Sequence, residues 1–136
     1  MKQTKCIMLI NEITSIIIEE SIYIHKSVGP GLFESLYEEL LSYRLIKRGL
    51  RIQKQKAVPV IFEEVKMGIG FRADLIVENK VLVEIKSVEA LANIASMQTL
   101  TYLRFTGISL GLLINFNVEK LKNGIKRIAN NYIEGS

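Results

Sequence analysis

One stretch decides the fold, Gly70-Phe-Arg-Ala-Asp-Leu-Ile-Val-Glu-Asn-Lys-Val-Leu-Val-Glu-Ile-Lys-Ser87. Two β-rich runs, 75–77 and 81–85, flank a Glu-Asn-Lys turn, and this pattern is typical of a β-hairpin. Asp74, Glu84 and Lys86 interrupt the apolar pattern, although charges are costly to bury unless they are paired or bind a metal. Two interpretations stay open. The charges hold a divalent cation that activates water, or they lie on the solvent-facing side of an edge hairpin.

The length of the turn decides whether the acidic residues can meet, because paired residues in a hairpin share a face of the sheet. A two-residue turn at Asn79 and Lys80 would pair Asp74 with Ile85. A three-residue turn over 78–80 instead pairs Asp74 with Glu84 and leaves the lysine two positions further along as a diagonal neighbour. Asn79 or Lys80 would then take the left-handed backbone conformation, which asparagine tolerates well. A metal site therefore requires the odd loop or a bulge.

Composition predicts one globular domain over residues 1–136, since this length can bury a real core but is short for two domains. Apolar residues make up 49% of the chain and charged residues 24%, which excludes a disordered or low-complexity protein. The net charge of +4 permits a polyanionic partner without requiring one. The single cysteine, Cys6, allows no internal disulfide. With an N-terminal apolar run too short for a signal or membrane span, we expect a cytoplasmic protein without membrane contact.

The segments before the hairpin read as two helices. Isoleucines recur at helical spacing over 9–28, and the Gly29-Pro30-Gly31 cluster ends that segment. A second helix is expected over 32–48, with Glu34 in its first turn. There a carboxylate is favoured by the helix dipole, and this is the better interpretation of Glu34 on spacing alone.

The remaining segments complete an α/β domain with a mixed sheet. Residues 52–62 read as strand, in which Pro59 indicates an edge or a bulge. A helix is expected over 89–105, and Gln98 and Tyr102 are spaced so that both can point at the end of the hairpin. The apolar run 110–116 should be a buried strand parallel to the second hairpin strand, joined by a right-handed crossover. Residues 125–132 fit a strand or a helical turn equally well.

These parts, in this order, resemble the PD-(D/E)XK nuclease superfamily, and more closely the GxxExxY protein family. The name-giving motif matches Gly31-Leu-Phe-Glu34-Ser-Leu-Tyr37. Five further segments also resemble that family: Phe71-Arg-Ala-Asp74, Glu84-Ile-Lys86, Gln98-Thr-Leu-Thr-Tyr102-Leu103, Gly111-Leu-Leu-Ile-Asn115-Phe116 and Gly124-Ile-Lys-Arg127. Each motif alone is weak, but six in the right order over residues 8–132 are specific. Ala73 stands where the superfamily usually has a proline.

The resemblance implies a restriction-endonuclease-like core, in which a mixed β-sheet with a central hairpin is flanked by helices. It implies that Asp74 and Glu84 bind Mg²⁺ or Mn²⁺, that Lys86 positions or activates the attacking water, and that Glu34 is an auxiliary acidic residue and metal ligand. Gln98 and Tyr102 match a further motif that helps to shape the site in exonuclease-like branches. Carboxylate ligands that retain waters favour Mg²⁺ or Mn²⁺ over zinc on chemical grounds as well.

Two classes of function follow from the sequence. The first is a metal-dependent nuclease that hydrolyses phosphodiester bonds in nucleic acid, with DNA favoured over RNA. The second is a catalytically silent module that binds nucleic acid or protein on the same fold. Because the positive charge is modest, unaided affinity for nucleic acid should be weak and salt-sensitive. A homodimer or a protein partner could supply the remainder.

Overall fold

The computed structural model describes residues 7–132 and 135–136, so Cys6 lies outside the described residues. Five strands form one mixed sheet in the order β1-β4-β5-β6-β7, and two short strands, β2 and β3, pair with each other. The elements are α1 (Ile10–Val28), α2 (Glu34–Lys47), β1 (Ile52–Val58), β2 (Ile61–Phe62), β3 (Val65–Lys66), β4 (Phe71–Val77), β5 (Val81–Lys86), α3 (Asn93–Thr106), β6 (Leu110–Asn115), the 3-10 helix η1 (Leu121–Gly124) and β7 (Ile125–Ala129). This is the restriction-endonuclease-like arrangement that the sequence predicts.

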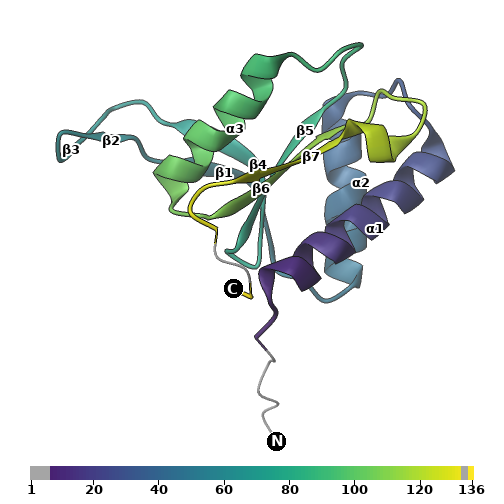
Figure 1. The fold of residues 1–136 in the computed structure, drawn as a ribbon, viewed down its shortest axis with the longest axis horizontal. Coiled ribbons are helices and arrows are strands. Elements are labelled where there is room, and N and C mark those ends of the chain that lie inside the picture. Colours follow the sequence, from purple (N-terminus) through teal and green to yellow (C-terminus); the bar gives the residue numbers. More distant parts are fainter. Residues whose placement is uncertain (1–6, 133–134) are drawn as a thin grey trace, which may run out of the picture.

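Helices cover both faces of the sheet (Figure 1). α1 and α2 pack on one face of the sheet and enclose the larger apolar core against it. The residues of this core include Ile13, Leu41 and Val83. α3 covers the other face through a smaller cluster that includes Leu82 and Leu103. β4 and β5 contribute residues to both clusters because successive side chains of a strand point to opposite faces. The central hairpin therefore lies between two apolar layers.

The central hairpin has the three-residue turn that a shared acidic face requires. Its strands pair as Leu75 with Val83 and Val77 with Val81. Asn79 is left-handed as expected, with φ 55°, and Glu78 just before it is also left-handed, with φ 53°. The carboxylate of Glu78 is buried and accepts a hydrogen bond of 2.6 Å from the backbone N–H of Arg51, which helps to hold this conformation.

Beyond the hairpin, the chain follows the predicted order with shifted boundaries. β6 runs parallel to β5, as the strand–helix–strand pattern predicts. α3 begins at Asn93, later than expected, and the segment after η1 is strand β7, antiparallel to β6. Among the described residues, no helix is long and apolar enough to cross a membrane.

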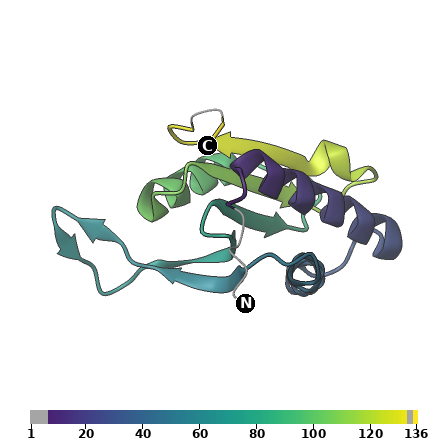
Figure 2. The same ribbon diagram turned by 90° about the horizontal axis from the view of Figure 1, so that it is seen from below.

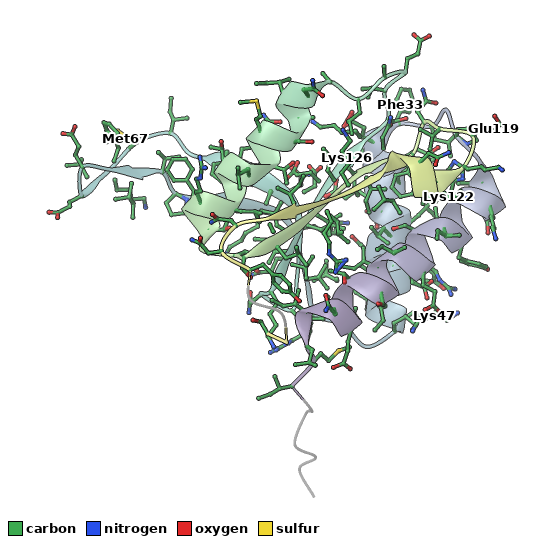
Figure 3. The ribbon with its side chains drawn as sticks, viewed as in Figure 1. Phe33, Lys47, Met67, Glu119, Lys122 and Lys126 are labelled. Carbon is green, nitrogen blue, oxygen red and sulfur yellow. The ribbon has the colours of Figure 1, made fainter. Side chains whose placement is uncertain are left out.

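The predicted strand over 52–62 is divided at Pro59 into β1, an edge strand of the sheet, and β2. β2 and β3 form a small hairpin that extends from the body of the molecule (Figure 2). We call residues 59–70 the arm. Its exposed apolar side chains are Ile61, Phe62, Val65, Met67 and Ile69, and Figure 3 shows Met67 on it, far from Phe33.

Candidate active site at the fork between β4 and β5

The two strands of the central hairpin separate just before the acidic pair. β4 and β5 pair at only three positions, the last of which is Leu75 with Val83. Beyond that point β5 continues along β6, where Glu84 lies opposite Leu113, while β4 continues along β1. The resulting fork leaves backbone groups of both strands without their ladder partners, and the side chains of Asp74 and Glu84 lie at it.

Asp74 and Glu84 bridge the fork by reciprocal hydrogen bonds. The backbone N–H of Ile85 donates to Oδ2 of Asp74 at 2.8 Å, and the backbone N–H of Asp74 donates to Oε1 of Glu84 at 3.3 Å. Each carboxylate therefore replaces part of the missing ladder, which fixes both side chains at the same place. The register that the three-residue turn predicts holds as far as Leu75 and Val83, and beyond it Asp74 and Glu84 meet through these side-chain hydrogen bonds and not as a ladder pair.

Burial and mutual repulsion make the acidic pair of Asp74 and Glu84 costly to ionise fully. Glu84 is only 6% exposed. Burial, followed by the negative charge of Asp74, raises the pKa of Glu84 to about 8, although the nearby ammonium of Lys86 acts in the opposite direction. A bound cation would stabilise the charged form of a carboxyl that is this costly to ionise.

Lys86 ends β5 as a half-buried residue opposite Asn115. The chain just after it is held firmly, because the side-chain amide of Asn115 accepts from the N–H of Val88 at 3.1 Å and donates to its carbonyl at 3.0 Å. Within the described residues no hydrogen bond or ion pair occupies the ammonium of Lys86, so its N–H donors are available to a ligand.

Glu34 lies at the start of α2 and is exposed. It lines an open hollow of about 540 Å³ together with Phe33, Ser87 and Asn117. The hydroxyl of Ser87 donates to the carbonyl of Leu32 at 2.7 Å, which holds the start of α2 against the end of β5. Glu34 therefore lies beside Ser87, the residue that follows Lys86. The hydrogen bonds of Asp74 and Glu84 described above do not involve Glu34.

The last residue of the same motif, Tyr37, has a structural part in this chain. Its ring is buried and stacks on Phe116 with the ring centroids 4.3 Å apart. Its hydroxyl donates to the carbonyl of Gly29 at 2.6 Å and accepts from the N–H of Leu32 at 3.2 Å. These bonds fix the loop that leads into α2, just before Glu34.

The acidic residue of α2 that approaches Asp74 is Glu38, through Gln55 of β1. The side-chain amide of Gln55 donates to Oε1 and Oε2 of Glu38 at 3.0 and 3.1 Å and to Oδ1 of Asp74 at 3.1 Å. Burial, with the charge of Asp74 as a further contribution, raises the pKa of Glu38. Gln55 has φ 48°, a left-handed conformation that costs a non-glycine residue about 1–2 kcal/mol.

Sequence reasoning missed both residues. Glu38 stands four positions after Glu34, so helical spacing puts the two carboxylates on the same side of α2 and could have suggested it. Gln55 gave no comparable signal, because its position depends on how β1 pairs with β4 across the arm.

α3 brings one of its two expected residues to the site. Burial, and then the negative charges of Glu84 and Asp74, raise the pKa of Tyr102. Its ring stacks on Phe71 with the ring centroids 4.0 Å apart, which aligns α3 with the start of β4. Gln98 is exposed one turn earlier on the same helix.

The residues at the fork fit a hard divalent cation. Mg²⁺ is usually held by one or two carboxylates and keeps its other positions for water or phosphate oxygens, and Asp74 and Glu84 supply two adjacent carboxylates. Over residues 7–132 and 135–136, no group of three or more His, Cys, Asp or Glu side chains is arranged to hold a metal. Glu34 is therefore not gathered with the pair into the three-carboxylate set expected from the sequence.

A mixed sheet with helices on both faces and an acidic pair at a strand fork defines a restriction-endonuclease-like fold. The family model described as "PD-(D/E)XK nuclease superfamily" matches residues 11–128, and the chain belongs to that superfamily. One similar solved structure is described as "Crystal structure of SSO0001", with 19% identity over 90% of this chain and 80% of that chain. Its TM-score is 0.45. No curated protein matches the sequence.

Proposed function

We propose that this protein is a divalent-metal-dependent nuclease that hydrolyses phosphodiester bonds in nucleic acid, with DNA favoured. The observation that carries the proposal is the reciprocal bridge of Asp74 and Glu84 at the fork, with Lys86 two residues after Glu84 on β5. Membership of the superfamily supports a nuclease type of activity. The six motif segments further support an assignment to the GxxExxY family.

Asp74 and Glu84 would hold Mg²⁺ or Mn²⁺. When bound, such an ion neutralises charge on the phosphate and lowers the pKa of a coordinated water, which supplies the nucleophile near neutral pH. Lys86 would donate hydrogen bonds to the phosphate or to the attacking water and so stabilise the charge that develops. The apolar residues that flank both carboxylates keep the acidic pair rigid.

The other predicted residues have supporting roles in this proposal. Tyr102 would shape the wall of the site on the α3 side, as the electrostatic effect of the acidic pair on its pKa supports. Gln98, one turn earlier, would contact the substrate from the same helix. Glu34 would act as an auxiliary acid from the hollow beside Ser87, acting on the substrate or on a second cation.

A second function, binding without catalysis, is favoured by the arm. An isolated two-stranded hairpin is only marginally stable in water, and here it carries five exposed apolar side chains. Such a surface is typical of a contact with protein, either a second copy of the chain or another partner. The two functions are compatible, because the arm and the acidic pair involve different residues.

Cleavage assays separate the two functions. Purified protein is incubated with single- and double-stranded DNA and RNA in Mg²⁺, Mn²⁺ or EDTA. We expect cleavage that requires metal, is abolished by Lys86→Ala and is retained by Lys47→Ala, a change at the opposite end of α2 from Phe33 (Figure 3). Binding without cleavage under every metal condition would overturn the nuclease proposal and favour the binding module.

A further inference from the structure

Gln55 is held in an unfavourable backbone conformation in the middle of an otherwise regular strand pair. Lys54 pairs with Leu75 and Lys56 pairs with Ala73, so Gln55 stands opposite Asp74 at the position where the β1–β4 pairing is interrupted. Its carbonyl accepts from Nη1 of Arg72 at 3.0 Å. Positive φ at a residue other than glycine persists only where surrounding contacts impose it, and such residues cluster at functional sites.

The side-chain amide of Gln55 donates both of its N–H groups to carboxylates. Nε2 lies 3.0 and 3.1 Å from the two carboxylate oxygens of Glu38 and 3.1 Å from Oδ1 of Asp74. Two hydrogens therefore serve three acceptors. The reversed amide would place its own oxygen against three carboxylate oxygens, so chemistry fixes its orientation.

Asp74 is consequently held at both oxygens. Oδ1 accepts from Gln55 and Oδ2 accepts from the backbone N–H of Ile85. Because each carboxylate oxygen can accept at two positions, one on each oxygen stays open to a cation while the group cannot rotate. The same amide links Asp74 to Glu38 on α2, a carboxylate of like charge that would otherwise repel it.

We propose that Gln55 is a positioning residue, which holds the Asp74 carboxylate in one orientation for the divalent cation and ties it to Glu38. The proposal rests on the proposed metal-dependent function. Some residues do not touch the metal but hydrogen-bond to its ligands and orient them. Replacing such a residue typically lowers metal affinity by about 10- to 100-fold. A neutral donor suits this place, because a lysine would compete with the cation and a carboxylate would add repulsion.

The test separates the N–H donors from the backbone strain. Gln55→Met keeps the length of the side chain and the strain but lacks the donors, and Gln55→Gly removes both. Glu63→Gly is the matched control, because Glu63 also has positive φ, at 51°, but lies in the turn of the arm. Mn²⁺ affinity is measured by calorimetry, with and without a short oligonucleotide, and stability by urea unfolding in EDTA.

We expect both Gln55 variants to bind Mn²⁺ about 10- to 100-fold more weakly, while Gln55→Gly is at least as stable as Gln55→Met and Glu63→Gly binds like wild type. The two Gln55 variants should cleave more slowly than wild type, and this difference in rate should shrink as the Mn²⁺ concentration is raised. A purely structural defect would not respond to the Mn²⁺ concentration in this way. Wild-type Mn²⁺ affinity in both variants would overturn the role of Gln55 and leave the nuclease intact. A wild-type protein that neither binds Mn²⁺ nor cleaves would overturn the proposed function and this role with it.

Discussion

Replacing Glu84 with glutamine should stabilise the metal-free protein, by an amount that grows with pH. The carboxyl of Glu84 ionises near pH 4.5 in the unfolded chain, whereas burial and Asp74 raise its pKa to about 8 in the folded chain. Between these two values the folded state binds more protons than the unfolded state. The contribution of Glu84 to the free energy of unfolding therefore falls as pH rises through this window and is level outside it.

The size of the effect follows from the same values. At 1.36 kcal/mol per pH unit, the window from 4.5 to about 8 corresponds to about 5 kcal/mol at full ionisation and to about 3 kcal/mol by pH 7. Glutamine resembles the protonated form of Glu84, since its amide oxygen can still accept from the N–H of Asp74 and its N–H₂ can donate to the carboxylate of Asp74. The variant therefore keeps the bridge and loses the titration.

Urea unfolding in EDTA at about pH 5, 7 and 8.5 measures the difference. We expect wild type and Glu84→Gln to be similar near pH 5, with the variant more stable by about 3 kcal/mol at pH 7 and by more at pH 8.5. Glu119→Gln, which changes an exposed carboxyl (Figure 3), should follow wild type. A difference between Glu84→Gln and wild type that stays constant with pH would refute the reasoning.

Two further predictions concern the fold around the site. Glu20 is 3% exposed and accepts hydrogen bonds of 2.7 Å from two arginine side chains, so Glu20→Gln should lower the free energy of unfolding by about 2–4 kcal/mol. Glu19→Gln, at an exposed position, should change it by less than about 0.5 kcal/mol, and equal effects in urea unfolding would contradict the burial argument. A Cβ added to Gly70 would lie 2.3 Å from the carbonyl oxygen of Val58, so Gly70→Ala should cost about 1–3 kcal/mol. Gly68→Ala meets no atom within 4 Å and should leave the melting temperature nearly unchanged, and a matching loss there would count against the steric explanation.

Local sequence signals were enough to predict the centre of the fold. The sequence left a two-residue and a three-residue turn open and linked a shared acidic face to the three-residue turn, and the register of Leu75 with Val83 is that of the three-residue turn. The apolar run after α3 had no polar alternation, which is typical of a strand covered on both sides, and β6 is buried along its whole length.

The contacts of Gln55 and Glu38 could not be predicted in this way. Gln55 meets Asp74 only because β1 and β4 pair across the arm, and the register of two strands separated by such an insertion is set by tertiary packing. The rotation of α2 about its axis is likewise set by its packing, with Tyr37 and Leu41 in the core. Spacing could place Glu34 and Glu38 on one side of the helix, but it could not say which of them faces Asp74.

The fork has a consequence for how the domain holds together. Asp74 belongs to the β1–β4 half of the sheet and Glu84 to the β5–β6–β7 half, and past Leu75 and Val83 the two halves are joined by side chains instead of a strand ladder. We call the boundary between these two halves the seam. A cation bound by one carboxylate from each half would link the two halves across it. Hydrogen exchange of the backbone amides at Asp74 and Ile85 would then slow on metal binding more than exchange at the far end of the hairpin, so the seam itself reports occupancy of the site.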